Sequence, residues 1–508
     1  MSVSAATKGD TASPAAPASR SSLPKASQRK ANMRPAVSAA LLACLALGAC
    51  AHVRDPDVRL PAAYEAPKGS APAGAIDLDR WWVGFNDAEL TQLIEQALVA
   101  NPDARSAAAR LAEARATRLE GLFHFLPQGD ATATTRSTDT TQTAGTVINF
   151  PGFSSSGTTN ASAANLNVSW EIDLFGRIFA TAKAANGDIA AARFNYEGAR
   201  ASLAANVADA YFLARGLAIQ LADARETAHI QRELYDVASK RAALGIAATS
   251  DADRVAGDLA QAESQATGLE AELQVQRRVL LVLAGRTIEP TANVKLDVAI
   301  GSGLPPVPDA IPSALLKRRP DVREAEARIA SAAGRSDLDT LAFLPTLTFT
   351  PGLGWAKNSQ PGFTSTTRST SIGGMIAQPL LSIPTKLEEL KAQNARTEQA
   401  VIAYEKAVQT AFSDSEAALV RLDSDRRRVA VLTDGEARAA RAYRASRIGY
   451  DRGITDLQTA LSIEESWRAT RTQLTTAQVQ AFRRTVQAYK ALGGGWPAGQ
   501  FPTQSQAR

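Results

Sequence analysis

Residues 165–179 read NLNVSWEIDLFGRIF and join two kinds of predicted structure with no loop between them. In the first part apolar and polar residues alternate, and a period of two predicts a strand with one apolar and one polar face. The apolar positions are Leu166, Val168, Trp170, Ile172 and Leu174, and the polar ones are Asn167, Ser169, Glu171 and Asp173. Phe175-Gly176-Arg177 then leads into an Ala-rich segment that predicts helix. The fold must therefore let a two-faced strand pass directly into a helix.

The predicted helices are long and occur in two matching sets. Residues 177–243 contain no breaker other than isolated glycines, and at 1.5 Å per residue they would span about 100 Å. Residues 385–451 are equally long. Returning helices of half that length are predicted at 251–284 and 456–492, and shorter helices that could continue them at 102–124 and 320–343. An apolar seam between Leu203 and Leu221 with charged flanks indicates coiled-coil packing.

The chain is an internal duplication, because NPDARSAAARLAEA at 101–114 matches RPDVREAEARIASA at 319–332. Each copy has a helix ending at Leu-Pro, two strand-like runs around a Ser/Thr/Gly-rich loop, and two long helices that meet at a glycine turn. The strands are predicted at 128–137, 163–174, 346–356 and 369–380, with the loops at 138–161 and 357–368. The predicted repeats are 86–300, with a tip hairpin at 244–250, and 301–495, with a tip hairpin at 449–455. Residues 496–508 are predicted to be a disordered tail.

The leader, residues 1–49, holds six basic residues against Asp10 alone and so accounts for the whole net charge of +5. The remainder is neutral overall, which removes the main argument for nucleic-acid binding. Its apolar run is too short to span a bilayer but fits a secretory signal, with Met1 or Met33 as the start. It ends in Leu47-Gly48-Ala49-Cys50, which resembles a bacterial lipobox. That resemblance predicts a diacylglycerol and an N-acyl chain on Cys50; a plain signal peptide with a chance cysteine is the alternative.

Residues 50–85 are predicted to be a lipid-anchored extended tether, since they are rich in Pro and Ala without periodicity. Asp87 is a suitable N-cap for the helix that follows. The two hairpin turns combine a glycine stop with a capping start, Gly245 followed by Ser250 and Gly453 followed by Thr455. Turns this compact suit protruding tips.

Catalytic patterns are not found in the sequence. Its three histidines, His52, His124 and His229, have no second ligand at metal spacing, so no metal site is predicted. No nucleophile elbow, P-loop or dinucleotide fingerprint occurs. Acid pairs such as Glu464-Glu465 are interpreted as helix-surface charges. The sequence therefore predicts neither an enzyme nor any cofactor besides the lipid on Cys50.

Several motifs together resemble the TolC-like outer-membrane efflux proteins, in the lipoprotein branch that includes OprM and NodT. They are WWVGFNDAELTQLIEQALVANPD, SWEIDLFGRI, IPSALLKRRPDVREAEARIA, LAFLP, QPLL and YKALGGGW. The resemblance implies a mainly α-helical chain whose homotrimer closes a twelve-stranded transmembrane β-barrel that continues into a periplasmic α-helical barrel. It also implies a passive duct that exports drugs or other toxic small molecules. The implied partners are a periplasmic adaptor protein and an inner-membrane pump, expected to be of the resistance-nodulation-division type.

The resemblance and barrel physics also assign the sites. A lipid-spanning sheet must close and must alternate apolar-out and polar-in. The positions expected to face lipid are Leu166, Val168, Trp170, Ile172, Leu347 and Phe349, with Trp170 either an interfacial anchor or a buried core residue. The tips expected to contact the adaptor are Leu244, Gly245, Ile246, Arg452, Gly453 and Ile454.

The resemblance also places a periplasmic gate just inside the second tip. The candidates are Tyr450, Asp456, Gln458 and Ser462. Gln458 and Ser462 stand where relatives place a leucine and an aspartate, so closure is expected to rest on tip packing and hydrogen bonds rather than on an acidic ring. A coiled-coil structural or adhesive surface lipoprotein is the alternative function, but it leaves the amphipathic strands and the duplication unexplained. An adaptor is a third reading, disfavoured because adaptors have a single helical hairpin.

Overall fold

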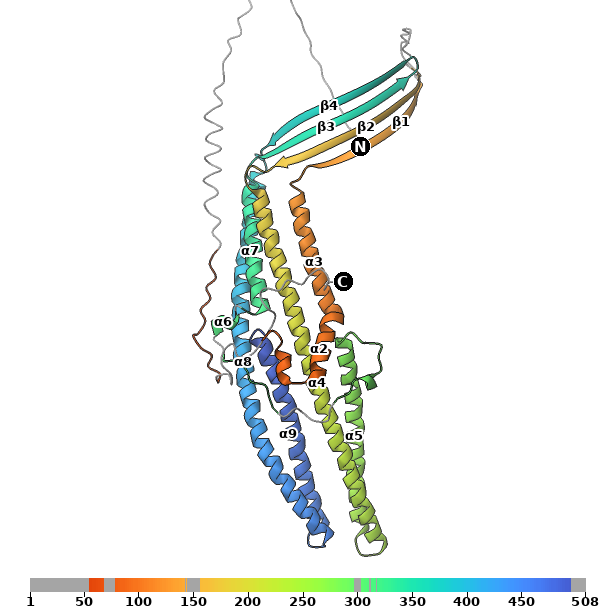
Figure 1. Cartoon of the computed structure of the whole chain (residues 1–508), viewed down its shortest axis with the longest axis vertical. Helices are drawn as coiled ribbons and strands as arrows, with labels where there is room; N and C mark the ends of the chain where they lie inside the picture. The colour runs from red at the N-terminus through yellow and green to blue at the C-terminus, as the bar shows by residue number, and fades with distance from the viewer. Residues whose placement is uncertain are drawn as a thin grey trace, which may run out of the picture. The chain divides into compact units, whose positions relative to one another are not determined.

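Four strands and a set of long helices form the described part of the chain (Figure 1). The computed structural model describes residues 54–67, 78–141, 143, 156–296, 303–309, 312–316 and 318–494. All of these belong to one compact unit, residues 51–508. The predicted leader, the lipid anchor at Cys50 and the C-terminal tail at 496–508 lie outside the described residues.

The elements follow one order twice: a short helix, two strands, a very long helix and a returning helix. The first set is α3 (Pro102–Phe123), β1 (Gln128–Thr140), β2 (Gly157–Ile172), α4 (Arg177–Ala243) and α5 (Thr249–Leu283). The second is α7 (Pro320–Leu341), β3 (Thr346–Gln360), β4 (Phe363–Ala377), α8 (Ile383–Asp451) and α9 (Leu457–Ala491). Outside the two sets lie η1 (Trp81–Phe85), α2 (Ala88–Ala100), η2 (Thr291–Asn293) and α6 (Pro312–Leu316). The long helices are therefore where their sequence predicts, within two residues at each end.

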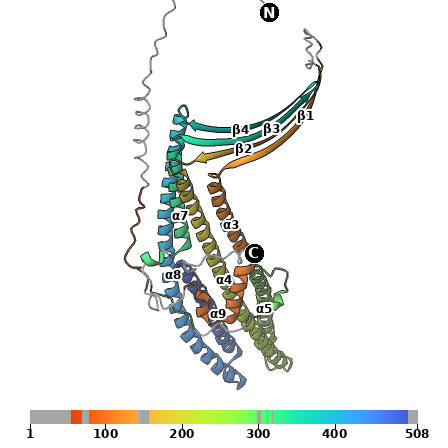
Figure 2. The ribbon, with the colours of Figure 1, turned by 45° about the horizontal axis from the view of Figure 1, so that its top comes forward.

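The strands form one antiparallel sheet in the order β1-β2-β3-β4, which leaves β1 and β4 as its edges (Figure 2). Directly paired residues point to the same side of a sheet, and the β2–β3 register pairs Leu166 with Leu353 and Trp170 with Phe349. The alternation predicted on β2 thus continues onto β3 as one apolar face and one polar face, while the positions paired with that apolar face on β1 are small residues such as Gly129 and Ala131.

The strand ends differ from their predicted positions. All four strands run further into the Ser/Thr/Gly-rich segments, so the loop predicted at 357–368 shrinks to Pro361-Gly362. At the helical end β2 stops at Ile172 rather than 174, and β4 stops at Ala377 rather than 380. Polar strand residues that reach beyond the apolar region keep their backbone pairing, which alternation of hydrophobicity does not reveal.

Asp173 does not belong to the polar strand face, contrary to the expectation. Its Oδ1 accepts the backbone N–H groups of Phe175, Gly176 and Arg177 at 2.8–3.2 Å, and its Oδ2 accepts that of Ile178 at 2.9 Å. These are the N–H groups at the start of α4 that lack partners within the helix. Gly176 has φ +86, so the turn from strand to helix depends on this residue.

The short helices continue the returning ones, as their lengths predict. Asn101, which caps α3, donates from Nδ2 to the carbonyl of Leu283 at the end of α5 at 3.0 Å. Arg319, just before α7, donates to the carbonyl of Ala491 at the end of α9 at 3.1 Å. Two interrupted helical columns therefore run beside the unbroken helices α4 and α8.

The main core lies where α2 and η1 pack on α4 and α9. Trp81 stacks on Tyr489 with ring centroids 5.6 Å apart, and Phe212 and Phe482 are 4.9 Å apart. Asp87 caps α2, as predicted, by accepting the N–H of Leu90, and its other oxygen accepts from Tyr211 and Arg215 of α4. The same carboxylate therefore starts α2 and holds it against α4.

The described parts of the segment predicted to be an extended tether, residues 54–67 and 78–85, are packed against the helices. Tyr64 stacks on Phe412 of α8 with centroids 5.6 Å apart, and the backbone N–H of Asp57 donates to Glu405 at 2.9 Å. Trp81 to Phe85 form the short helix η1. The prediction was wrong here because the contacts lie more than three hundred residues away along the chain.

Small residues allow α4 and α7 to cross closely near the sheet. A Cβ atom added to Gly187 would lie 2.7 Å from Cα of Ser331, and one added to Gly334 would lie 2.7 Å from Cα of Ala184. Each glycine therefore sits directly on the backbone of the other helix. Within the described residues, no helix is both long and apolar enough to cross a membrane.

Candidate functional site

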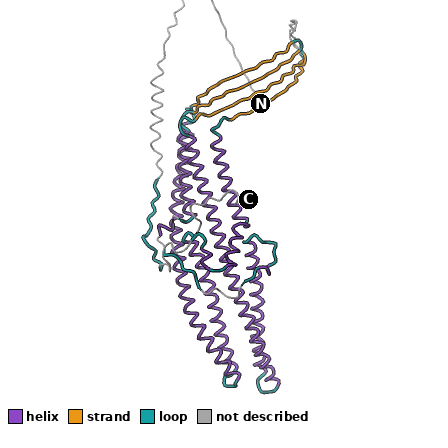
Figure 3. Tube along the Cα trace, in the orientation of Figure 1, coloured by secondary structure: helices purple, strands orange, loops and turns teal. Residues whose placement is uncertain are grey.

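The two helical hairpins end in matching turns, α4/α5 at 244–248 and α8/α9 at 452–456 (Figure 3). In the first, the N–H of Ile246 bonds the carbonyl of Arg241 at 2.9 Å around Gly245, whose φ is +70. In the second, the N–H of Ile454 bonds the carbonyl of Gly449 at 2.8 Å around Gly453, whose φ is +73. Both are Schellman stops, in which only glycine adopts the positive φ without strain.

The tips present apolar side chains to solvent. Leu244, Ile246 and Ile454 are 73%, 72% and 79% exposed. The returning helices begin within two residues of their predicted starts, but the predicted capping residues, Ser250 and Thr455, were wrong. In the structure α5 begins after Ala248 without a side-chain cap, and α9 is capped by Asp456, which accepts the N–H of Thr459 at 2.9 Å.

Just above the tips, a small cluster joins all four helices. It consists of Leu234, Ala238, Val255, Tyr450 and Leu461. The Tyr450 ring lies 5.3 Å from the guanidinium carbon of Arg241, and Arg241 donates to its hydroxyl at 3.5 Å. Of the four gate candidates, Tyr450 is buried between the hairpins, whereas Asp456, Gln458 and Ser462 are exposed in the single chain.

Glu464 was interpreted as a surface charge, and that interpretation was wrong. It is 1% exposed and accepts from Nε2 of the fully buried Gln231 of α4 at 3.3 Å. Arg468 lies 3.5 Å from its other oxygen. Burial raises the pKa of Glu464, although Arg468 and Arg447 act against the shift and Asp258 adds to it. A carboxylate and an amide thus connect the two hairpins inside the seam between α4 and α9.

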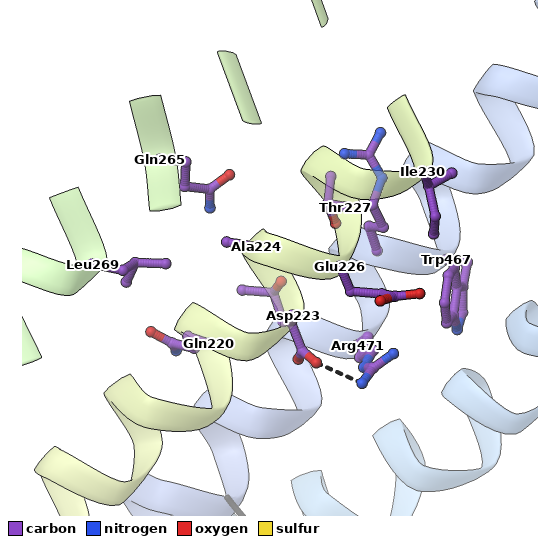
Figure 4. Close-up of a pocket in the computed structure, with 12 residues that line it drawn as sticks. Gln220, Asp223, Ala224, Glu226, Thr227, Ile230, Gln265, Leu269, Trp467 and Arg471 are labelled. Atoms are coloured by element: carbon purple, nitrogen blue, oxygen red, sulfur yellow. Dashed lines mark ion pairs between the residues drawn. The ribbon is translucent and has the colours of Figure 1, made fainter. Parts of the chain in front are cut away.

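Further from the tips, the seam opens into a cavity of about 90 Å³ between α4, α5 and α9 (Figure 4). Asp223 of α4 forms an ion pair with Arg471 of α9 at 2.5 Å, the interaction dashed in Figure 4. Burial raises the pKa of Asp223 despite that partner. Trp467, also on this wall, stacks on Tyr443 with centroids 4.5 Å apart. The α4–α9 contact is therefore polar at this level, as it is at Gln231 and Glu464, and apolar further along at Phe212 and Phe482.

At the opposite end of the helices, the sheet carries the residues predicted to face lipid. Leu166, Trp170 and Ile172 pair with Leu353, Phe349 and Leu347, so all six share one face. Val168 alternates onto the same face and pairs with Gly129 of β1. Trp170 is 39% exposed, which excludes the buried-core reading for the single chain, and its Nε1 donates to the carbonyl of Phe125 at 3.0 Å.

Among the described residues, no group of three or more His, Cys, Asp or Glu side chains could hold a metal ion. The geometry instead combines a two-faced sheet, long helical walls and exposed apolar tips. A model of the outer membrane efflux protein family matches residues 93–286 and 311–494. The chain belongs to this family.

This outer membrane efflux protein is 26% identical over 461 residues to the pyoverdine export outer membrane protein OpmQ of Pseudomonas aeruginosa, covering 89% of the chain and 96% of OpmQ. It is 28% identical over 480 residues to outer membrane protein OprJ of the same species, covering 91% of the chain and 96% of OprJ. The crystal structure of the Campylobacter jejuni CmeC outer membrane channel matches with a TM-score of 0.75 at 21% identity, covering 88% of this chain and 96% of the CmeC chain. The predicted family, efflux function and outer-membrane location are thus confirmed, and the fold is that of TolC-like channels.

The sequence did not reveal the buried polar contact between α4 and α9. Gln231 and Glu464 are 233 positions apart, and each looks like an ordinary surface residue in its own helix. One signal was present: both lie among the apolar residues that pack the hairpins near the tips, such as Leu234 and Leu461.

Proposed function

We propose that three copies of this chain close a twelve-stranded barrel that continues into an α-helical tube, forming a passive duct from the periplasm to the exterior. The main support is the four-stranded sheet. Its central strands β2 and β3 have one apolar face and one polar face, and its outer strands β1 and β4 leave two unpaired edges. Open sheet edges cannot face hydrocarbon, and four strands are too few to close a barrel alone. Three sheets joined β1 to β4 remove every edge.

The helical part supports the same head-to-tail ring. Among the described helices, α4 contacts α2, α3, α5, α7 and α9, whereas α8 lies beyond α7 and α9. One flank of the chain is therefore α3 and α5, below β1, and the other is α8, below β4. A ring that joins β1 to β4 brings α8 of one copy against α3 and α5 of the next, which is a heterologous closed interface.

The remaining parts of the proposal follow the family. The exposed tips around Gly245 and Gly453 contact a periplasmic adaptor, through which an inner-membrane pump of the resistance-nodulation-division type delivers small molecules. Cys50 carries the lipid anchor, and Trp170 anchors the barrel at the periplasmic membrane surface. The entrance closes by packing around Tyr450 rather than by an acidic ring, because neutral Gln458 and Ser462 occupy the ring positions.

Purified full-length protein tests the duct. Trimers that resist heating on denaturing gels and that conduct ions in planar bilayers are expected. Conductance should rise in Tyr450→Ala, which removes the ring that packs on Arg241, and should stay unchanged in Gln458→Ala and Ser462→Ala. Monomers without conductance would instead favour the coiled-coil surface lipoprotein. Unchanged conductance in Tyr450→Ala would reject the proposed gate while leaving the duct intact.

A further inference from the structure

A larger cavity, of about 390 Å³, lies at the joint between α9 and α7. Its walls come from α4, α8, α9 and the residue before α7. Five lining side chains are cationic, namely Arg319, Arg421, Arg483, Arg484 and Lys490, and two are acidic, namely Asp209 and Asp414. The proposed duct function assigns no role to this concentration of positive charge.

Both acids of the cavity are already engaged. Asp209 binds Arg483 through two contacts of 2.8 and 2.9 Å. Asp414 lies 3.5 Å from Arg319, which also pairs with Asp321 at 2.7 Å. Asp209 and Arg483 neutralise each other, whereas Arg319 faces both Asp321 and Asp414, so these three residues together carry one net negative charge that offsets one of the other cations.

Three cations remain. Arg484 lies 3.6 Å from Asp425 and donates from Nε and Nη2 to the side-chain oxygen of Gln480 at 3.0 Å each, so its one ion pair among the described residues is a long one. Arg421 and Lys490 form no ion pair with any residue in the described part of the chain. The cavity is therefore lined by two positive charges without a carboxylate partner, and both side chains are exposed, so that they are accessible to a solute.

The cavity faces away from the aromatic core. On α9, Phe482 and Tyr489 point to the aromatic residues of η1, whereas Gln480 and Gln487 line the cavity. At 100° per residue, Gln480 and Gln487 lie about 140–180° around the helix from Phe482 and Tyr489. Because η1 and α2 cover the aromatic side, the opposite side is the one that can line an open tube.

We propose that this cavity is a binding site for the oxyanion group of a small solute, a carboxylate, sulfate or phosphate, inside the duct. Guanidinium groups match the geometry of such oxyanions, and the amides of Gln480 and Gln487 add hydrogen-bond donors. Three copies place a ring of six unpaired cations at one level of the lumen, with no acidic ring at the gate to oppose it. The inference rests on the proposed duct and makes it selective for anions.

Charge removal in planar bilayers is the direct test. Under a potassium chloride gradient, the zero-current potential should show a preference of the wild-type protein for chloride over potassium. Arg421→Gln/Lys490→Gln should lower that permeability ratio at least about threefold, because two local charges per protomer are lost. Arg421→Lys should stay near wild type, and Lys490→Gln alone should give an intermediate value.

Lys295→Gln is the matched control, since Lys295 is exposed beside η2 and lines neither described cavity. It should leave the permeability ratio unchanged. Equal ratios in all conducting variants would overturn the anion site while leaving the duct standing. Absence of conductance in every protein would instead reject the duct.

A second measurement is independent of conduction. Sulfate, compared with chloride at equal ionic strength, should raise the melting midpoint of the detergent-solubilised wild type and of Lys295→Gln, and this shift should be lost in Arg421→Gln/Lys490→Gln. An identical sulfate effect in all three proteins would reject the site whatever the bilayer result.

Discussion

Adding one carbon where α4 and α7 cross should weaken the whole helical wall. In Gly334→Ala the new Cβ would lie 2.7 Å from Cα of Ala184 and 3.0 Å from its Cβ, closer than van der Waals contact permits. The main obstacle is backbone, which cannot rotate away as a side chain can. The two helices must therefore separate locally or lose their regular geometry.

The expected loss of folding stability in Gly334→Ala follows from two opposing effects. In a helix, alanine is favoured over glycine by about 1 kcal/mol, whereas overpacking a close contact costs about 1–3 kcal/mol. Gly257→Ala on α5 is the matched control, because its new Cβ would meet no atom of the chain within 4 Å. Gly334→Ala should therefore be about 2 kcal/mol per protomer less stable than Gly257→Ala.

Thermal melting of the helices by circular dichroism in detergent is the assay. The midpoint of Gly334→Ala should lie about 2–4 °C below that of Gly257→Ala. Gly187→Ala, at the same crossing, should behave alike, and the double variant should lose less than the sum because both substitutions push apart the same pair of helices. If Gly334→Ala melted at or above Gly257→Ala, the close packing of α4 on α7 would be refuted.

Burial raises the pKa of Glu464, so the stability of the wild-type protein falls as the pH rises through the pKa that this carboxyl has in the folded state. Glu464→Gln should therefore melt at a higher temperature than wild type near pH 8. This difference in melting temperature should fade near pH 4. A constant gain at all pH values would contradict the buried acid. Leu353→Arg, four residues further into the barrel than the Trp170–Phe349 pair and on the same face, should impair assembly in the outer membrane at about 2–4 kcal/mol per chain, whereas Thr350→Arg on the polar face should assemble; equal yields would show that the faces are misassigned. Ile246→Asp should abolish capture of the adaptor while leaving heat-resistant trimers, and undiminished capture would remove this tip from the interface.

Much of the fold could be predicted because its elements are long and periodic. The bounds of α4 were predicted to the residue, since Gly176 and Gly245 mark its two ends and no proline interrupts it. The lipid-facing residues of β2 were predictable for a similar reason, as alternation alone assigns them to one face. Both patterns depend on neighbouring residues only.

The rest depends on contacts between distant segments. Thr455 was predicted to cap α9, yet the turn places the Asp456 carboxylate on the N–H of Thr459. The carboxylate of Glu464 is buried by α4, and the cavity around Arg421 forms only where α8 and α9 meet the residue before α7. None of these partners can be read from a single helix.

The joints between α5 and α3 and between α9 and α7 have a mechanical consequence. The returning helices α5 and α9 are 35 residues each, about 52 Å long. Each meets the short helix of its own column end to end. The side chain of Asn101 or Arg319 donates to a carbonyl in the last turn of the returning helix. Each can therefore act as a lever arm whose pivot is its joint, while unbroken α4 and α8 serve as rigid struts. A tilt of about 10° at a joint would move the tip by about 9 Å. Small changes near the middle of the wall are thus amplified into large displacements at the far end.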